Sequence, residues 1–153
     1  MMQQNRRKNW IVRPMTDEDI PAAARVEMEC FPDPWSEDSL KGMLGGRGCY
    51  GWAIFDGEEP AGYCLVQQVL DEGEILRIAV FNKFKRQGAA GCLLEEIFKQ
   101  NPETVFWNLE VREGNVPAVR CYEKFGFVAL GIRKNYYKDP VENALVMQKA
   151  DAQ

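Results

Sequence analysis

The sequence predicts a mixed α/β domain with the element order βααβββαβαββ. Two observations support this fold class. Short stretches rich in β-branched and aromatic residues, several of them alternating apolar with polar positions, indicate strands. Longer stretches between them carry apolar residues at helical spacing. The length of 153 residues, with 46% hydrophobic and 27% charged residues, suits a single domain over residues 1–153 with a substantial core.

The first predicted elements are a strand and a helix. Residues 9–15, "NWIVRPM", alternate as a half-buried strand does. Thr16 and Asp19 then have the spacing of a capping-box variant, in which two side chains satisfy backbone N–H groups at a helix start. We therefore expect a helix from about Asp17 to Cys30.

A second helix and a pair of strands are predicted next. The segment "FPDPWS", residues 31–36, holds two prolines and interrupts the helical pattern. Ser36 is placed to cap a helix that runs to Gly45-Gly46. Residues 49–73 are predicted as two strands joined around Asp56-Gly57, a dipeptide typical of tight hairpin turns.

The middle of the chain is predicted as strand, helix, strand. The strands are "EILRIAVF", residues 74–81, and "TVFWNLEV", residues 104–111. The helix between them is expected from Gly88 to Gln100, because its apolar residues recur at helical spacing. These residues are Leu93, Leu94, Ile97 and Phe98.

The last predicted helix has clear signals at both ends. Asn115 is a favourable cap, and Pro117 falls in the first turn, where its missing N–H is tolerated. The helix should end at about Phe125, because Gly126 can adopt the left-handed conformation that terminates helices. Two strands are expected to follow, at residues 127–132 and 144–149.

Composition excludes several functional classes. The formal net charge is −4 and the pI about 5.0, which argues against direct nucleic-acid binding. No apolar run approaches the length that spans a membrane, so no membrane partner is expected. The chain has no histidine, which removes a histidine-based triad and the commonest metal ligand, and we expect no metal. The five cysteines lack CxxC spacing and are interpreted as reduced thiols of a cytoplasmic protein.

Positive charge and small residues gather before the third predicted helix. Lys83, Lys85 and Arg86 precede the run Gln87-Gly88-Ala89-Ala90-Gly91. A helix start offers unpaired N–H groups and partial positive charge, and small residues let a phosphate approach the backbone. From these residues alone, a flexible helix start with solvated lysines is an equally good interpretation. The run is neither a P-loop nor a GxGxxG motif.

Two separated segments resemble the GNAT family of N-acetyltransferases. The loop 85–90 matches the family pattern Q/R-x-x-G-x-G/A, which wraps the coenzyme pyrophosphate, with Lys85 at the first position. The segment "WNLEVREGNVPAVRCYEKFGF", residues 107–127, resembles the second family signature, a strand ending in Glu followed by N-x-x-A-x-x-x-Y-x-x-x-G-F. "FPDPWS" and "IRKNYY" are similar to substrate-side segments of the RimI subgroup, the bacterial ribosomal-protein-alanine N-acetyltransferases.

The resemblance implies a fold and a coenzyme site. The fold is a central mixed, mostly antiparallel sheet flanked by helices, with two splayed strands that hold acetyl-CoA. Backbone groups of Ile78, Ala79 and Val80 would bind the pantetheine arm, with an N–H near Val80 as the oxyanion donor. Asn115 would add a contact near the pantetheine. The residues implied for the pyrophosphate are Lys85, Arg86, Gln87, Gly88, Ala89, Ala90 and Gly91.

The resemblance also implies two catalytic residues. Glu110 would be the general base for the acceptor amine, and Tyr122 the acid that protonates the leaving thiolate. From position alone, a strand-end carboxylate that faces water or pairs with Arg112 is the better interpretation of Glu110. For Tyr122 alone, a half-buried aromatic residue packed on the sheet is the more common role.

Four aromatic residues are candidates for the wall of an acceptor channel: Phe31, Trp35, Tyr136 and Tyr137. The function implied is acetyl transfer from acetyl-CoA to a protein N-terminal α-amine, with the N-terminal alanine of a small-subunit ribosomal protein as the subgroup's substrate. Two alternatives stay open. One is a GNAT enzyme for lysine side chains or small amines, and the other is a non-catalytic acetyl-CoA-binding module.

Overall fold

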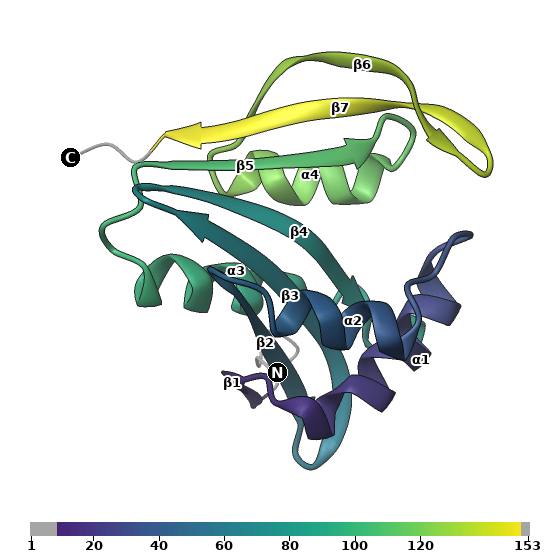
Figure 1. Cartoon of the computed structure of the whole chain (residues 1–153), viewed down its shortest axis with the longest axis vertical. Helices are drawn as coiled ribbons and strands as arrows, with labels where there is room; N and C mark the ends of the chain where they lie inside the picture. Colours follow the sequence, from purple (N-terminus) through teal and green to yellow (C-terminus); the bar gives the residue numbers. More distant parts are fainter. Residues whose placement is uncertain (1–8, 151–153) are drawn as a thin grey trace, which may run out of the picture.

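The computed structural model describes residues 9–150 and contains the predicted sequence of strands and helices (Figure 1). In chain order the elements are β1 (Trp10–Pro14), the 3₁₀ turn η1 (Asp17–Asp19), α1 (Ile20–Cys30), α2 (Glu37–Leu44), β2 (Cys49–Asp56), β3 (Glu59–Val69), β4 (Glu72–Val80), the 3₁₀ turn η2 (Asn82–Phe84), α3 (Ala89–Gln100), β5 (Phe106–Arg112), α4 (Val116–Lys124), β6 (Val128–Lys138) and β7 (Val141–Ala150).

All seven strands described form one sheet in the order β1-β2-β3-β4-β5-β7-β6. Every neighbouring pair is antiparallel except β4 and β5, which run parallel. Their parallel pairing follows from the connection, because α3 crosses over one face of the sheet between them. The prediction of a mixed, mostly antiparallel sheet is confirmed.

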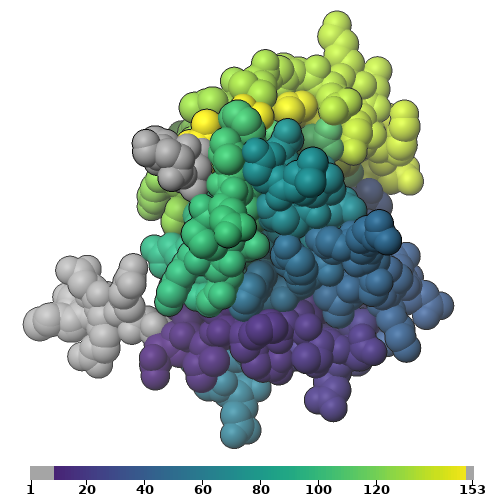
Figure 2. All heavy atoms as spheres, turned by 60° about the vertical axis from the view of Figure 1, so that its left-hand side comes forward, coloured from purple at the N-terminus to yellow at the C-terminus, as the bar shows by residue number. Residues whose placement is uncertain are grey.

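The helices cover the two faces of the sheet unequally. On one face, α1 and α2 pack over β2–β4 around a cluster that includes Leu40, Tyr63 and Leu65. On the other face, α3 and α4 bury a larger cluster with Trp107 and Phe127 at its centre. Figure 1 shows no helix over the β5, β7 and β6 part of the sheet on the side of α1 and α2. Figure 2 places the β6–β7 hairpin and the N-terminal part of the described chain at opposite ends of the molecule.

The predicted caps are confirmed in detail. The hydroxyl oxygen of Ser36 accepts the N–H of Ser39 at 3.1 Å at the start of α2. Asn115 Oδ1 accepts the N–H of Ala118 at 3.3 Å at the start of α4. At the first helix, a carboxylate oxygen of Asp19 accepts the N–H of Thr16 at 2.9 Å, and a 3₁₀ turn precedes the regular helix. Gly126 has a positive φ of 99° just after α4, as a helix terminator requires.

The clearest difference from the sequence prediction is the length of β6. The strand was expected to end at Ile132, but it continues to Lys138. Irregularities in its pairing with β7, between Ala129 and Gly131 and between Arg133 and Tyr137, break the alternation that would reveal a strand. Asn135, with a φ of 53°, lies inside the second irregularity. Within residues 9–150, no helix is long and apolar enough to cross a membrane.

Candidate acetyl transfer site

The sheet opens between β4 and β5. The two parallel strands pair only from Glu72 with Phe106 to Ile75 with Leu109, and then diverge (Figure 1). Leu76 is an extra residue in β4, because Ile75 and Arg77 pair with successive residues of β3. Such a bulge bends its strand. β4 stays paired with β3 as far as Val80, so the divergence leaves one edge of β4 unpaired. The splayed strands that the family resemblance implied are therefore present.

Backbone groups of β4 face this opening at alternate residues. The N–H of Phe81 bonds to the carbonyl of Ala61 in β3 at 2.9 Å. Because N–H and C=O groups alternate in direction along an antiparallel pair, Ile78 and Val80 direct theirs away from β3. The thiol of Cys30 reaches the carbonyl of Val80 at 3.1 Å from that side. Ala79 turns its backbone groups toward β3, so only Ile78 and Val80 of the three predicted residues present them to the opening.

The start of α3 lies just beyond the end of β4. Gly88 caps the helix in the left-handed conformation, with a φ of 87°, and a Cβ built on it would meet no atom within 4 Å. No described atom beside Gly88 therefore blocks the close approach of a phosphate that the sequence predicts. Gln87 is fixed on both sides: its carbonyl accepts the indole N–H of Trp10 at 3.0 Å, and its amide donates to the carbonyl of Lys83 at 3.0 Å.

The other predicted loop residues have different surroundings. Lys85, Arg86 and Gln87 are exposed, and Arg86 has a positive φ of 63°. Ala89 is buried in the core. A Cβ on Gly91 would lie 3.2 Å from the ring of Phe125, so the small residue at this position also lets α3 pack against the end of α4. Ala90 is partly buried and packs on the same core.

Glu110 lies on the face of β5 that no helix of residues 9–150 covers (Figure 1). Its neighbours Leu109 and Val111 point into the core, so strand alternation places Glu110 on the opposite face. Its carboxylate forms an ion pair with Nε of Arg133 from β6. A hydrogen bond to this carboxylate and burial raise the pKa of Tyr136. The sequence left open that Glu110 pairs with an arginine. Glu110 does so, but its partner is Arg133 and not Arg112.

Tyr122 approaches from the other side of the sheet. It is buried in the core cluster beneath β5, and its ring packs edge-on against Phe127 at 5.7 Å between centroids. Burial raises the pKa of its hydroxyl, so the phenol keeps its proton at neutral pH. Its side chain thus has the packing role that the sequence left open. Glu110 and Tyr122 belong to opposite faces of the sheet. A molecule bound in the opening between β4 and β5 could contact side chains from both faces.

Two arginines hold the candidate acceptor walls. Arg77 of β4 lies over the rings of Phe31 and Trp35, at 3.8 Å and 4.3 Å from its Cζ to the centroids. Its guanidinium is bound by the carboxylate of Glu27, with Nη2 to Oε1 at 2.8 Å and Nε to Oε2 at 2.9 Å. Glu27 is wholly buried and also accepts the N–H of Trp35 at 2.8 Å.

The second arginine, Arg112 at the end of β5, fixes the β6–β7 turn. It donates to the carbonyls of Asp139 and Pro140 at 3.3 Å and 2.9 Å and to Glu142 at 3.1 Å. Its Cζ lies 4.3 Å from the ring centroid of Tyr137. Burial and the charge of Glu110 raise the pKa of Tyr137 to about 12.

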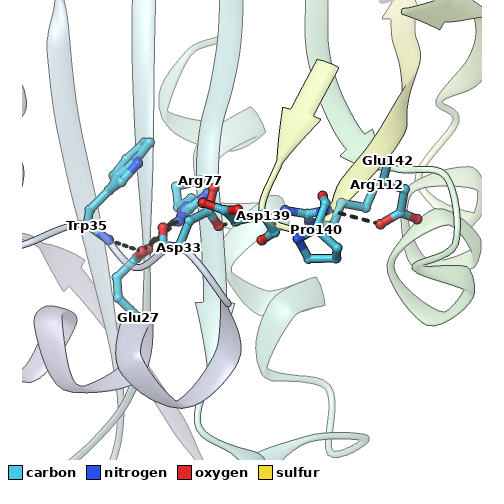
Figure 3. Close-up of polar contacts among 8 residues, drawn as sticks. All are labelled: Glu27, Asp33, Trp35, Arg77, Arg112, Asp139, Pro140 and Glu142. Carbon is cyan, nitrogen blue, oxygen red and sulfur yellow. Dashed lines mark hydrogen bonds and ion pairs between the residues drawn. The ribbon is translucent and has the colours of Figure 1, made fainter. Parts of the chain in front are cut away.

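Asp33 connects the two arginines. Its carboxylate lies 3.9 Å from Nη2 of Arg112, and its carbonyl accepts Nη2 of Arg77 at 3.2 Å (Figure 3). The two aromatic segments predicted as acceptor walls are therefore linked through Arg77 and Arg112, which belong to the two diverging strands. Tyr136 and Tyr137 pack edge-on, with ring centroids 5.1 Å apart.

Sequence reasoning missed Glu27 and Arg77. A signal was present: Glu27 recurs at helical spacing with the buried Ile20 and Ala23, a core position for a charged residue. Arg77 likewise interrupts an apolar strand. Opposite charges at two interior positions indicate a buried pair, since isolated buried charges are very costly. Among residues 9–150, no group of three or more His, Cys, Asp or Glu residues is arranged to hold a metal ion.

A sheet opened between two parallel strands, with a helix start at one end and a carboxylate at the edge, defines the N-acetyltransferase class of fold. The chain belongs to the acetyltransferase (GNAT) family, whose model matches residues 20–127. The ribosomal protein bS18-alanine N-acetyltransferase of Escherichia coli strain K12 is 36% identical over 135 residues, which cover 84% of this chain and 89% of that protein. A putative ribosomal protein bS18-alanine N-acetyltransferase of Bacillus subtilis strain 168 is 35% identical over 140 residues, covering 89% and 92%.

Solved structures agree with this assignment. The crystal structure of the ribosomal-protein-S18-alanine N-acetyltransferase from Escherichia coli has a TM-score of 0.86 and 30% identity to this chain, covering 94% of this chain and 95% of that one. Arabidopsis thaliana Naa50 in complex with the bisubstrate analogue CoA-Ac-MVNAL has a TM-score of 0.80 over 93% of this chain and 99% of that one. At 16% identity, the second likeness shows the fold alone.

Proposed function

We propose that this protein transfers the acetyl group of acetyl-CoA to a protein N-terminal α-amine, with the N-terminal alanine of a bS18-type ribosomal protein as its acceptor. The observation that carries the proposal is the opening between β4 and β5, with the start of α3 beyond one strand and Glu110 on the other. The proposed acceptor is taken from the two similar proteins described above, which are named ribosomal protein bS18-alanine N-acetyltransferases, one of them as putative. The five free cysteines support the cytoplasm as its location.

The residues around the opening fit acetyl-CoA, which would bring the acetyl thioester. The N–H groups at the start of α3, with Lys85 and Arg86 nearby, suit its pyrophosphate, since helix starts bind anions. The backbone groups of Ile78 and Val80 suit the pantetheine amides, as an added strand would. Asn115, at the start of α4, would make a further contact near the pantetheine.

The chemistry follows from three groups. Glu110 takes a proton from the acceptor ammonium, and the neutral nitrogen attacks the thioester carbonyl. The N–H of Val80 stabilises the negative charge that develops on the carbonyl oxygen. As the carbon–sulfur bond breaks, Tyr122 donates its proton to the thiolate; its raised pKa keeps the phenol protonated until that step. The attacking nitrogen loses its second proton at the same time, and a proton returns through solvent to the Tyr122 phenolate. No covalent acyl-enzyme is needed, and no cysteine has a histidine to activate it.

The acceptor is expected to enter between the two aromatic segments. Phe31 and Trp35 would form one wall and Tyr136 and Tyr137 the other, held by Arg77 and Arg112 respectively. Enzymes for lysine side chains or small amines are the runner-up, as is a non-catalytic module. The names of the curated relatives favour an N-terminal amine over these.

The test is a panel of acceptors assayed for release of free thiol from acetyl-CoA, with the product located by mass spectrometry. The panel comprises a peptide beginning with Ala, the same peptide with a blocked N-terminus and an internal lysine, and a small polyamine. Acetylation at the α-amine of the first peptide, at least tenfold faster than of the others, is expected. Preference for the blocked peptide or the polyamine would overturn the proposed acceptor. Failure to acetylate all three would overturn the proposal that the protein is an enzyme.

A further inference from the structure

The proposed base, Glu110, is already occupied by a cation from its own chain. Its carboxylate is ion-paired with Arg133, whose side chain is 60% exposed while that of Glu110 is 18% exposed. Arg133 also lies over the ring of Tyr136, at 5.9 Å from the centroid. The guanidinium thus sits at the solvent side of Glu110, among residues proposed to receive the acceptor.

A second carboxylate faces the same cation. Glu74 of β4 pairs with Asn108, which lies two residues before Glu110, so Glu74 and Glu110 project from the same face of neighbouring strands. Burial and the charge of Glu110 raise the pKa of Glu74, and Arg133 opposes this rise. Like charges on adjacent strands repel, so Arg133 compensates two carboxylates where β4 and β5 begin to separate.

The acceptor needs the same position. An α-amine has a pKa of about 8, so most of it arrives as an ammonium at neutral pH. This ammonium must reach Glu110 to lose its proton, and Arg133, which is always protonated, holds that carboxylate.

The geometry points to Arg133 as an internal competitor that occupies the acceptor ammonium position and is displaced by it. Glu74 then holds the incoming cation beside Glu110 until Glu110 takes its proton. The inference rests on the proposed function, since it concerns the same acceptor site. Arg133 can leave readily, because its side chain is long and largely exposed, so its guanidinium exchanges the carboxylate for water at little cost. Its competition is therefore expected to weaken acceptor binding by only about two- to fivefold.

The test compares Arg133→Gln, which removes the charge, with Arg133→Lys, which keeps it. Each variant and the wild type, saturated with CoA, is titrated calorimetrically with a peptide beginning with Ala and with the same peptide acetylated at its N-terminus. Arg133→Gln should bind the free peptide about two- to fivefold more tightly than wild type, and Arg133→Lys should resemble wild type. The blocked peptide has no ammonium, so all three proteins should bind it alike.

Two further measurements complete the test. In steady-state assays, the gain in Arg133→Gln should appear as a lower KM for the free peptide and not as a higher kcat. Glu74→Gln, which keeps Arg133, should bind the free peptide a few times more weakly and the blocked peptide unchanged.

Equal or weaker binding of the free peptide by Arg133→Gln would overturn the inference, as would a gain that the blocked peptide shares. If Arg133→Gln does not fold, as judged by its melting curve, an unchanged affinity of Glu74→Gln for the free peptide overturns it instead. Since binding is measured without turnover, these outcomes are separate from the failure of wild type to acetylate any N-terminal peptide. That failure would overturn the proposed function.

Discussion

Replacing Glu27 by alanine should destabilise the protein more than any other single change at the acceptor side. Glu27 is wholly buried on α1, and its carboxylate accepts hydrogen bonds from Arg77, from the hydroxyl of Tyr63 and from the backbone N–H of Trp35. Alanine removes all of these acceptors at once. The guanidinium of Arg77, whose side chain is only 13% exposed, would lose its carboxylate partner.

The expected magnitude follows from this loss. Breaking a buried ion pair by removing one partner costs about 3–5 kcal/mol, because the remaining charge is left uncompensated. Arg77 keeps its contacts with Phe31, Trp35 and the carbonyl of Asp33, so about 3 kcal/mol is expected. For a domain of this size, that corresponds to a fall in Tm of about 10 °C. Glu27→Gln keeps an acceptor of similar shape and should cost less.

The assay is chemical denaturation of wild type, Glu27→Ala, Arg77→Ala and the double variant, with Glu95→Ala on the exposed face of α3 as control. The double variant should lose much less than the sum of the single variants, since each removes the same pair. Acceptor KM should rise in Glu27→Ala, because Trp35 loses its anchor. A loss below about 1 kcal/mol in Glu27→Ala, or additive losses, would refute the reasoning.

The further predictions concern the site and its supports. Tyr122→Phe keeps the buried ring, so turnover should fall about 10- to 1000-fold with a small change in Tm; a large fall in Tm with turnover retained would show a structural residue only. Gly88→Val should clearly weaken acetyl-CoA binding in a calorimetric titration, because it places a branched side chain where the backbone is open and costs about 1–2 kcal/mol of left-handed strain. Lys85→Ala, an exposed charge beside the same loop, should cost at most about 1 kcal/mol of that affinity, and a larger loss than in Gly88→Val would argue against a backbone cradle. Burial opposes ionisation of Asp19, but hydrogen bonds from Arg13 and from the N–H of Thr16 lower its pKa below the ordinary value. The ionised Asp19 therefore stabilises the fold above about pH 4, and this stabilisation is lost as the pH falls through the lower pKa that Asp19 has in the folded protein. Asp19→Asn should be less stable than wild type at pH 7 and equally stable at the acid end of a pH series. A difference independent of pH would contradict the assignment.

The elements that depend on local signals could be predicted from the sequence. Ser36 and Asn115 cap their helices with side chains that reach backbone groups three residues away, and Gly126 needs only its own freedom of conformation. The hairpin at Asp56-Gly57 is local in the same sense, and Gly57 has a positive φ of 64°. β6 beyond Ile132 could not be predicted, because its pairing with β7 extends through two irregularities that disturb the alternation.

Contacts between distant residues were the harder part of the site. Glu27 and Arg77 are separated by 50 positions, and only the fold brings them together. Arg112 is the nearer arginine to Glu110 in the sequence and lies on the same face of β5. Its guanidinium nevertheless binds the β6–β7 turn and Glu142, and not Glu110. The partner is instead Arg133 of β6, which lies two strands away from β5 in the sheet, with β7 between them. No local signal in the sequence indicates a contact over that separation. The start of α3 was located correctly because the motif and the helix start coincide.

The most direct test of the proposed function is the pH–rate profile of Glu110→Gln. The variant is nearly isosteric but cannot accept the proton of the acceptor amine. We expect kcat/KM for a peptide beginning with Ala to fall by at least about tenfold at pH 7. Glu113→Gln, an exposed carboxylate just after β5, is the matched control and should retain wild-type rates.

The defect in Glu110→Gln should shrink as the pH rises through about 8, because more of the acceptor then arrives as the neutral amine. Glu113→Gln should follow the wild-type profile throughout. Profiles of wild type and Glu110→Gln that superimpose from pH 6 to 9 would contradict the account, because Glu110 would then be only the ion-pair partner of Arg133.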